Sequence, residues 1–261
     1  MNGPGPIVIK LGGSILEDPA SRRIALGSIA DAWRAGESVV LVHGGGRKID
    51  SMLAALGIPK QTHRGLRITD EPTLEVVVGV LAGIVNKCLV GELAAAGVPA
   101  AGISGADGAT LTADLHPAID GVTLGRVGRV TGANPTLIQA IAGRGMLPVV
   151  GSVALGRGGQ LLNVNADAAA SAVAVGLGAR QLVYLTDVDG LLDERGALIP
   201  SISADSARML VEYSIVKGGM LPKLQSAVDA VAGGVGKVVI AGPRYHAEIL
   251  QGTGGTHLVA A

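Results

Sequence analysis

Short apolar runs alternate with amphipathic stretches along most of the chain. Runs rich in Val, Ile and Leu occupy residues 7–11, 38–42, 147–150, 182–185 and 237–240, and 100–103 is a further strand candidate. Helical patterns over 19–35, 47–56, 137–142, 167–176, 204–212 and 221–232 lie between them. Short apolar runs separated by helices are typical of buried strands joined by crossover helices. The pattern therefore predicts an α/β protein with a mostly parallel sheet.

Two segments depart from this regular alternation. Residues 73–96 form a long helical pattern that is apolar nearly all round, so the helix must be buried on more than one side. A core helix and a subunit interface both explain it. Residues 105–132 are rich in Gly and Asp, and the pieces 122–124 and 126–130 predict hairpins there.

A new strand–turn cycle begins after Gly176, which predicts an N-terminal lobe over 1–176 and a C-terminal lobe over 177–261.

Composition and charge exclude several classes of function. Lys plus Arg and Asp plus Glu both number 21, so the formal net charge is zero, unlike a nucleic-acid surface or a polybasic membrane anchor. Aromatic residues make up 2%, which leaves little material for stacking on bases. We identify no secretory signal and no apolar run of the roughly 18 residues that a membrane span needs. These observations predict a cytoplasmic protein with neither nucleic acid nor membrane as partner.

Glycine clusters end three of the predicted strands. They are Gly12-Gly13, the run 44–46, and the turn from Asp187 to Gly190. Glycine turns at the carboxyl ends of parallel strands bind anions through backbone N–H groups, although they also serve as plain structural turns. The phosphate-binding motif of P-loop proteins is absent, because Gly236-Lys237 is followed by Val238. The dinucleotide motif is also absent after the first strand.

Two lysines and one amide-rich segment stand beside such turns. Lys10 interrupts an apolar strand just before Gly12, where it either reaches out to solvent or sits at the mouth of an anion site. Lys223 lies near a helix start, where its charge opposes the helix dipole and a bound phosphate would relieve the repulsion. The segment 163–167, Asn-Val-Asn-Ala-Asp, precedes another helix. Capping by Asn165 or Asp167 is the simpler explanation of that segment.

Taken together, the motifs of this chain resemble those of the amino acid kinase family, and within it those of members that phosphorylate N-acetyl-L-glutamate. The matching segments are Lys10-Leu11-Gly12-Gly13, His43-Gly44-Gly45-Gly46, 65–69, 81–83 with Asn86-Lys87, 105–108, 163–167, 185–188 with 190–191, and 218–223. They occur in family order over nearly the whole chain. The resemblance implies an open, mostly parallel sheet in a three-layer αβα sandwich. The N-terminal lobe would bind the amino-acid substrate and the C-terminal lobe ATP.

The resemblance also implies a reaction and a role for each matching residue. The γ-phosphoryl group of MgATP passes to the side-chain carboxylate of N-acetyl-L-glutamate, a step of arginine biosynthesis, with Mg²⁺ held mainly by phosphates and by no metal-binding residues of the chain. Lys10 and Lys223 would neutralise the transferred group, and Asp167 would position both lysines. Gly45, Gly46, Arg67 and Asn163 would bind the substrate. The nucleotide-side residues would be Gly12, Gly13, Asp187, Val188, Asp189, Gly190, Leu191, Leu192, Val216 and Lys217.

The chain departs from the arginine-inhibited branch of that family. Those members carry a helix before the first strand, whereas Met1 to Pro6 is rich in Gly and Pro. We therefore expect a homodimer indifferent to arginine, joined through helix 73–96 by Val77, Leu81, Ile84 and Val85. Cys88, in the same helix, is expected in the core. Two alternatives are a kinase for carrier-linked glutamate or aminoadipate, and a non-catalytic amino-acid-binding regulator.

Overall fold

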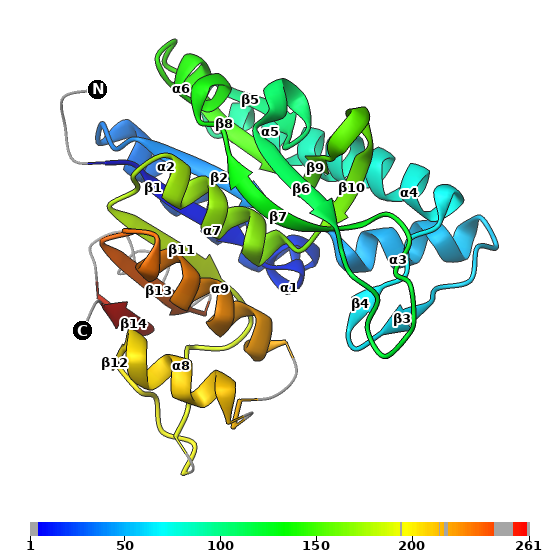
Figure 1. Ribbon diagram of the computed structural model, residues 1–261. Coiled ribbons are helices and arrows are strands. Elements are labelled where there is room, and N and C mark those ends of the chain that lie inside the picture. The colour runs from blue at the N-terminus through cyan, green and yellow to red at the C-terminus, as the bar shows by residue number, and fades with distance from the viewer. Residues whose placement is uncertain (1–4, 194, 214, 217–218, 243–252, 260–261) are drawn as a thin grey trace.

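One twisted sheet of eight strands forms the centre of the molecule. The computed structural model describes residues 5–193, 195–213, 215–216, 219–242 and 253–259 (Figure 1). The sheet order is β12 (Ser201–Ser203), β14 (Thr256–Val259), β13 (Lys237–Ala241), β11 (Gln181–Leu185), β1 (Ile7–Leu11), β2 (Val39–His43), β8 (Leu147–Gly151) and β5 (Ala100–Ser104). The strands from β13 to β5 pair in parallel, and only the β13–β14 pair is antiparallel. The predicted mostly parallel sheet is confirmed.

Helices cover both faces of this sheet, as the sandwich prediction requires (Figure 1). One core cluster combines Val8, Val40 and Leu182 with α7 (Ala166–Gly176), α8 (Ala204–Glu212) and α9 (Met220–Ala232). The opposite cluster combines Ile9 and Leu41 with α1 (Gly13–Glu17), α2 (Pro19–Arg34) and α5 (Asn86–Ala95). Successive strand residues point to opposite faces, so each central strand contributes to both clusters. This burial on both faces explains why the strands read as continuous apolar runs.

A small closed sheet and a short hairpin lie outside the central sheet, and the antiparallel pairing of 111–115 with 127–133 in the closed sheet partly confirms the hairpins predicted over 105–132. The closed sheet contains β6 (Leu111–Leu115), β7 (Val127–Ala133), β9 (Val153–Leu155) and β10 (Leu161–Val164), and the hairpin contains β3 (Thr62–His63) and β4 (Leu66–Arg67). The predicted piece 126–130 is confirmed as part of β7. The piece 122–124 is not a strand, because Val122 makes only an isolated bridge with Ile119. The remaining helices are α3 (Gly46–Ala55), α4 (Glu71–Val78) and α6 (Thr136–Ala142).

The long apolar helix is continuous from α4 through a π-helical segment, η1 (Gly79–Val85), into α5. Val77 and Leu81 are fully buried against α3 in this chain's own core, so the expectation that they face a second subunit was wrong. Ile84 is 39% exposed and remains available at the surface. Cys88 is exposed, which also corrects its assignment to the core. The apolar character of the helix therefore arises largely from packing within the chain.

The same helix revises one expectation about membranes. Its 25 residues, Glu71–Ala95, are long and apolar enough to cross a membrane by length and composition alone. The expectation that no apolar stretch reaches that length was therefore wrong. One such helix is weak support for a membrane span, since core helices pass the same test. Here its inner face packs against the sheet and α3.

The central sheet takes strands from both predicted lobes. Strands β1, β2, β5 and β8 come from residues 1–176, and β11 to β14 come from residues 177–261. In Figure 1, α8 and α9 lie together over the C-terminal strands, while the closed sheet and hairpin lie toward the other end. The boundary near Gly176 stays a prediction.

Candidate active site

Lys10 is the polar member of the central strand β1. The alternation of β1 places Val8 and Lys10 on the face covered by α7, while Ile9 and Leu11 face α1 and α2. Lys10 pairs in register with Tyr184 of β11 on one side and Val42 of β2 on the other. Its side chain is buried. Lys10 therefore does not reach out to solvent from the strand end, which leaves the anion-site interpretation.

Asp167, on the first turn of α7, meets both predicted lysines. Its Oδ1 lies 2.8 Å from Lys10 Nζ and 3.1 Å from Lys223 Nζ, and its Oδ2 lies 3.3 Å from Lys223 Nζ. The cap of α7 is Asn165, whose side chain accepts hydrogen bonds from the backbone N–H groups of Asp167 and Ala168. Asp167 is thereby free to pair with the lysines. The predicted triad is assembled as the resemblance implied.

Burial sets the charge states in this triad. Burial raises the pKa of Asp167, but the two adjacent ammonium groups more than offset it and leave the pKa below its ordinary value. Burial, together with Lys10, lowers the pKa of Lys223. The Lys223 ammonium also lies 5.4 Å from the ring centroid of Tyr184, whose hydroxyl donates to the Asp167 carbonyl. Two positive charges are therefore held together by one carboxylate and an aromatic ring.

A pocket of about 440 Å³ opens in front of the triad. The glycine turn after β1 forms part of its wall, held against β11 by the Gly12 N–H, which donates to the Leu185 carbonyl at 2.8 Å. A side chain at Gly12 would meet that carbonyl at 2.9 Å, so the turn requires glycine. The lining residues are Lys10, Gly12, Gly13, Ser14, Arg47, Thr186, Asp187, Val188, Gly219, Met220 and Lys223. Six of these lining residues were predicted as site residues. The catalytic ones are Lys10 and Lys223, and the nucleotide-side ones are Gly12, Gly13, Asp187 and Val188.

The other predicted nucleotide-side residues lie beyond this pocket lining. Gly190 has φ +147° and lies against Thr256, where a side chain would clash. Leu191 is buried in the core, and its N–H donates to Thr256 Oγ1 at 2.8 Å. Leu192 is exposed and Asp189 lies half-buried beside Gly242, while Val216 packs partly against the core. Lys217 falls outside the described residues. The part of the chain that the structure describes holds no cluster of three or more His, Cys, Asp or Glu side chains that could bind a metal.

The glycine run after β2 adjoins a half-buried arginine, Arg67. Arg67 Nη2 donates to the Gly46 carbonyl at 3.2 Å and pairs with Asp50 of α3. Burial raises the pKa of Asp50, but its hydrogen bonds to Lys60 and Arg67 leave that pKa below its ordinary value, so the carboxylate stays charged. The Arg67 side chain is only 12% exposed, and its Nη1 has no hydrogen-bond partner among the described residues. A buried guanidinium nitrogen without a partner is costly unless an anion binds it.

Asn163, at the end of β10, joins this region through Thr69. Its Nδ2 donates to Thr69 Oγ1 at 3.1 Å, and that hydroxyl donates to the Arg67 carbonyl at 2.9 Å. Asn163 is also close in sequence to Asp167, because β10 leads directly into α7. The structure therefore links Gly46, Arg67 and Asn163 through Thr69, while their role in substrate binding stays a prediction.

The π-helical segment η1 supports the same glycine run from behind. A side chain on Gly45 would meet Leu81 at 3.0 Å and Val85 at 3.2 Å, so the helix packs directly on the loop. His43 precedes the run, with Nδ1 at 2.9 Å from the Gly44 carbonyl and Nε2 at 3.0 Å from Asn86 Nδ2. Burial lowers the pKa of His43 to about 4, so the ring is neutral at pH 7. This contact network positions the loop without adding charge.

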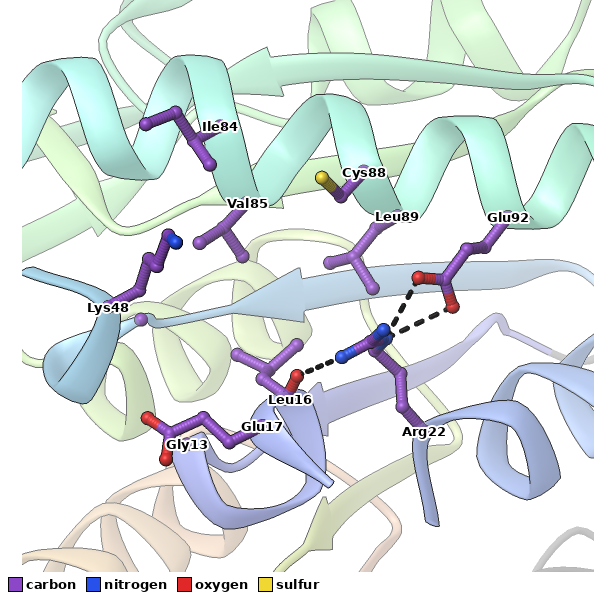
Figure 2. A pocket seen from close by; sticks show the side chains of 11 residues that line it. Gly13, Leu16, Glu17, Arg22, Lys48, Ile84, Val85, Cys88, Leu89 and Glu92 are labelled. Carbon is purple, nitrogen blue, oxygen red and sulfur yellow. Dashed lines mark hydrogen bonds and ion pairs between the residues drawn. The ribbon is translucent and has the colours of Figure 1, made fainter. Parts of the chain in front are cut away.

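A second pocket, of about 360 Å³, also borders the glycine turns (Figure 2). It shares Gly13 and Gly45 with the region described above, and Leu16, Val85 and Leu89 form its apolar wall. Figure 2 shows Arg22 closing one end through its ion pair with Glu92, at 2.9 Å. The triad does not line this pocket.

Several residues at the site were not predicted from the sequence. Ser14, Arg47 and Thr186 line the triad pocket, and Asp50 and Thr69 orient Arg67 and Asn163. Ser14 and Arg47 follow the two glycine runs directly, which is the only sequence signal that could have found them. Thr69 lies in the matching segment 65–69, whereas Asp50 looks like an ordinary polar surface position.

Comparison with known proteins agrees with the geometry. The model of the amino acid kinase family matches residues 5–242. The chain belongs to the amino acid kinase family. An acetylglutamate kinase from Solibacter usitatus is 43% identical over 236 residues, covering 90% of each chain. One from Rubrobacter xylanophilus is 44% identical over 238 residues, covering 91% of this chain and 89% of the relative.

Among solved structures, smu.665 from Streptococcus mutans has a similar fold to this chain. The TM-score is 0.83 with 32% identity, and the match covers 98% of both chains. The amino acid kinase fold therefore accounts for the central sheet and both helix layers.

Proposed function

We propose that this chain transfers the γ-phosphoryl group of ATP to the side-chain carboxylate of N-acetyl-L-glutamate. The observation that carries the proposal is Asp167, which holds Lys10 and Lys223 together at the wall of one pocket. The relatives that match along most of the chain are acetylglutamate kinases. The reaction places this enzyme in arginine biosynthesis, and we propose that it acts in the cytoplasm.

The arrangement fits phosphoryl transfer between two anions. An acceptor carboxylate oxygen forms a bond to the γ-phosphorus, the bond from that phosphorus to the β,γ-bridging oxygen breaks, and ADP leaves with the electron pair. The acceptor oxygen and the phosphate repel one another, so alignment and charge neutralisation do most of the work. Lys10 and Lys223 supply fixed positive charge on the transferred group. Asp167 keeps both ammonium groups in place without being consumed.

The acceptor is held at the other end by the loop and Arg67. The partnerless Nη1 of Arg67 suits a bidentate contact with the α-carboxylate of the substrate. Asn163 completes this site from β10. Mg²⁺ accompanies ATP and is held mainly by phosphate and water oxygens, since Asp167 already pairs with both lysines.

Release of ADP with different acceptors tests this function. We expect ADP release with N-acetyl-L-glutamate and little with free glutamate or aspartate. ADP release only with a carrier-linked glutamate or aminoadipate would favour that alternative acceptor. Absence of ADP release with every acceptor, together with binding of the amino acid, would indicate a regulator instead.

Replacing Arg67 with alanine is expected to raise the KM for N-acetylglutamate about 10–100-fold, because a charge-assisted contact with the substrate is lost. The KM for ATP should change little. Steady-state kinetics with each substrate varied in turn measures both values. Arg64→Ala is the matched control, since Arg64 lies in the same hairpin but pairs with the exposed Asp120 at 2.8 Å. A loss of ATP affinity with normal acetylglutamate affinity contradicts this assignment.

We also propose a homodimer through the exposed side of the helix Glu71–Ala95. That side carries Ile84 and small residues that allow close helix contact, namely Gly79, Gly91, Ala94 and Ala95. Strand β5, at one edge of the central sheet, lies next to this helix. Light scattering should give twice the chain mass, and Ile84→Asp should reduce it to one chain. Ile24→Asp, at an exposed position of α2, should leave the dimer intact.

A monomeric wild-type chain would contradict the dimer. The expected indifference to arginine is checked in the same samples by adding millimolar arginine and measuring mass and rate. A hexamer or saturable inhibition would contradict that expectation.

A further inference from the structure

Arg47 stands at the wall of the triad pocket without a role in the scheme above. It occupies the first turn of α3, directly after the glycine run 44–46. Its side chain is 67% exposed, and Nη1 lies 3.0 Å from Glu17 Oε2 on α1. An exposed ion pair of this kind contributes about 0–1 kcal/mol, so the guanidinium can leave it at little cost.

The charge balance of the pocket singles out this residue. Among the described residues, Lys10 and Lys223 are balanced by Asp167, which pairs with both, and by Asp187, which lines the same pocket. Two lysines and two aspartates leave no net charge to meet a triphosphate and a carboxylate. Arg47 is the additional cation in the lining. With Arg47 turned toward the phosphates, the pocket carries net positive charge.

Its position also lies between the two substrates. The preceding residue, Gly46, accepts a hydrogen bond from Arg67, the proposed acceptor-binding arginine. On its other side, Arg47 shares the pocket with Gly12 and Gly13 of the nucleotide turn. A cation in the first turn of a helix also opposes the helix dipole, which a bound anion would offset. The γ-phosphoryl group is the anion that passes between these two positions.

We propose that Arg47 binds the γ-phosphoryl group of ATP as a third cation, and that Glu17 holds its guanidinium aside when the pocket is empty. The inference rests on the proposed kinase function and adds a residue to it. The planar fork of Arg47 holds two parallel N–H groups in a fixed geometry that matches two phosphoryl oxygens, whereas a lysine acts as a rotatable point charge. The contact is made to the transferred group, so it is absent with ADP.

The next residue supplies a matched control. Lys48 follows Arg47 on the same helix turn but lines the second pocket, as Figure 2 shows. Successive helix residues point about 100° apart. Lys48→Ala therefore removes one positive charge from the same turn without removing one from the triad pocket.

The test compares nucleotides that do and do not carry a γ-phosphate. Calorimetric titration with Mg–AMP-PNP and with Mg–ADP measures affinity without any acceptor, so it does not depend on the identity of the acceptor. For Arg47→Ala we expect about 10–100-fold weaker AMP-PNP binding and nearly unchanged ADP binding. Arg47→Lys should recover only part of the loss. Lys48→Ala should bind both nucleotides as the wild type does.

Glu17→Gln separates a phosphate contact from a structural one. It removes the same Arg47–Glu17 ion pair but keeps the guanidinium, so we expect AMP-PNP affinity equal to or above that of the wild type. Equal loss of AMP-PNP affinity in Glu17→Gln and Arg47→Ala would overturn the proposal. It would show that nucleotide affinity depends on the ion pair between α1 and α3 and not on a phosphate contact. Unchanged AMP-PNP binding in Arg47→Ala, or an equal loss for ADP, would also overturn it. Kinase activity of the wild type would still support the proposed function in those cases.

Discussion

Replacing Lys10 or Lys223 with alanine is expected to lower turnover about 10²–10³-fold, the scale of losing one preorganised partner of transition-state charge. Both ammonium groups are buried beside Asp167 at the wall of the pocket, so water does not replace either of them at the same position. Each single variant leaves Asp167 paired with the other lysine, and the fold should survive. Single-turnover rates with ATP and N-acetylglutamate, alongside thermal melts, measure both effects.

Arginine substitutions at these two positions should recover little activity. The guanidinium is wider than an ammonium group, so at position 223 it would not fit between Asp167 and Tyr184 without displacing one of them, and at position 10 it would have to fit in the buried space beside Asp167. Near-normal turnover in either alanine variant would contradict the proposed charge roles.

The pH dependence of turnover gives a separate readout of Lys223. Burial and the charge of Lys10 lower the pKa of Lys223 below its ordinary value of 10.5, so the ammonium loses its proton earlier as pH rises. Turnover should therefore fall on the alkaline side at a pH below that of an ordinary lysine. In Lys10→Ala, where one repelling charge is gone, the residual activity should fall at a higher pH than in the wild type.

Replacing Asp167 with asparagine is expected to lower the free energy of unfolding by about 3–5 kcal/mol, because two buried ammonium groups lose their shared counter-charge. The asparagine side chain has nearly the same shape as that of aspartate. The loss of stability therefore reflects the missing charge and not a change in side-chain volume. Urea unfolding at pH 7 measures it. Asp114→Asn is the control, since the ion pair of Asp114 with the exposed Arg157 should contribute about 0–1 kcal/mol.

The difference between Asp167→Asn and the wild type should depend on pH in a defined direction. The pKa of Asp167 is lower in the folded chain than its ordinary value of 3.8. The stabilisation by its charge is therefore fully present above that ordinary pKa and is lost as pH falls through the folded value. The two proteins should converge in strongly acidic solution. A deficit below about 1 kcal/mol at pH 7 would contradict the expected charge effect.

Much of the site could be predicted from the sequence because its signals are local. Gly12-Gly13 and the run 44–46 directly follow apolar strands, and this pattern marks the strand ends of a parallel sheet. The order of eight short motifs then indicated the amino acid kinase family, and the family model and the fold confirmed it. Asn165 was also a recognisable helix cap, since Asn before a helix accepts the free N–H groups of the first turn.

The closed sheet could not be predicted in the same way. Strands β6, β7, β9 and β10 are short, and β7 pairs with β10 across an intervening helix and two further strands. Pairing between distant segments leaves no periodic signal in either segment alone. The piece 122–124 alternates like a strand but has no partner strand, so it remains a loop with a single bridge.

By itself, the sequence determined the six parallel strands at the centre of the main sheet, most of the helices, the glycine turns and the family, because their signals lie in neighbouring residues. Only the tertiary structure decided which side chains share a pocket. It turned Val77 and Leu81 inward and left Ile84 at the surface, since one side of the long helix packs on α3 and the sheet. It also gave the contacts of Asp167, on α7, with Lys10 of β1 and Lys223 of α9, a grouping that the family resemblance implied but that no local pattern contains. Such a grouping depends on strand register and helix packing across the whole chain.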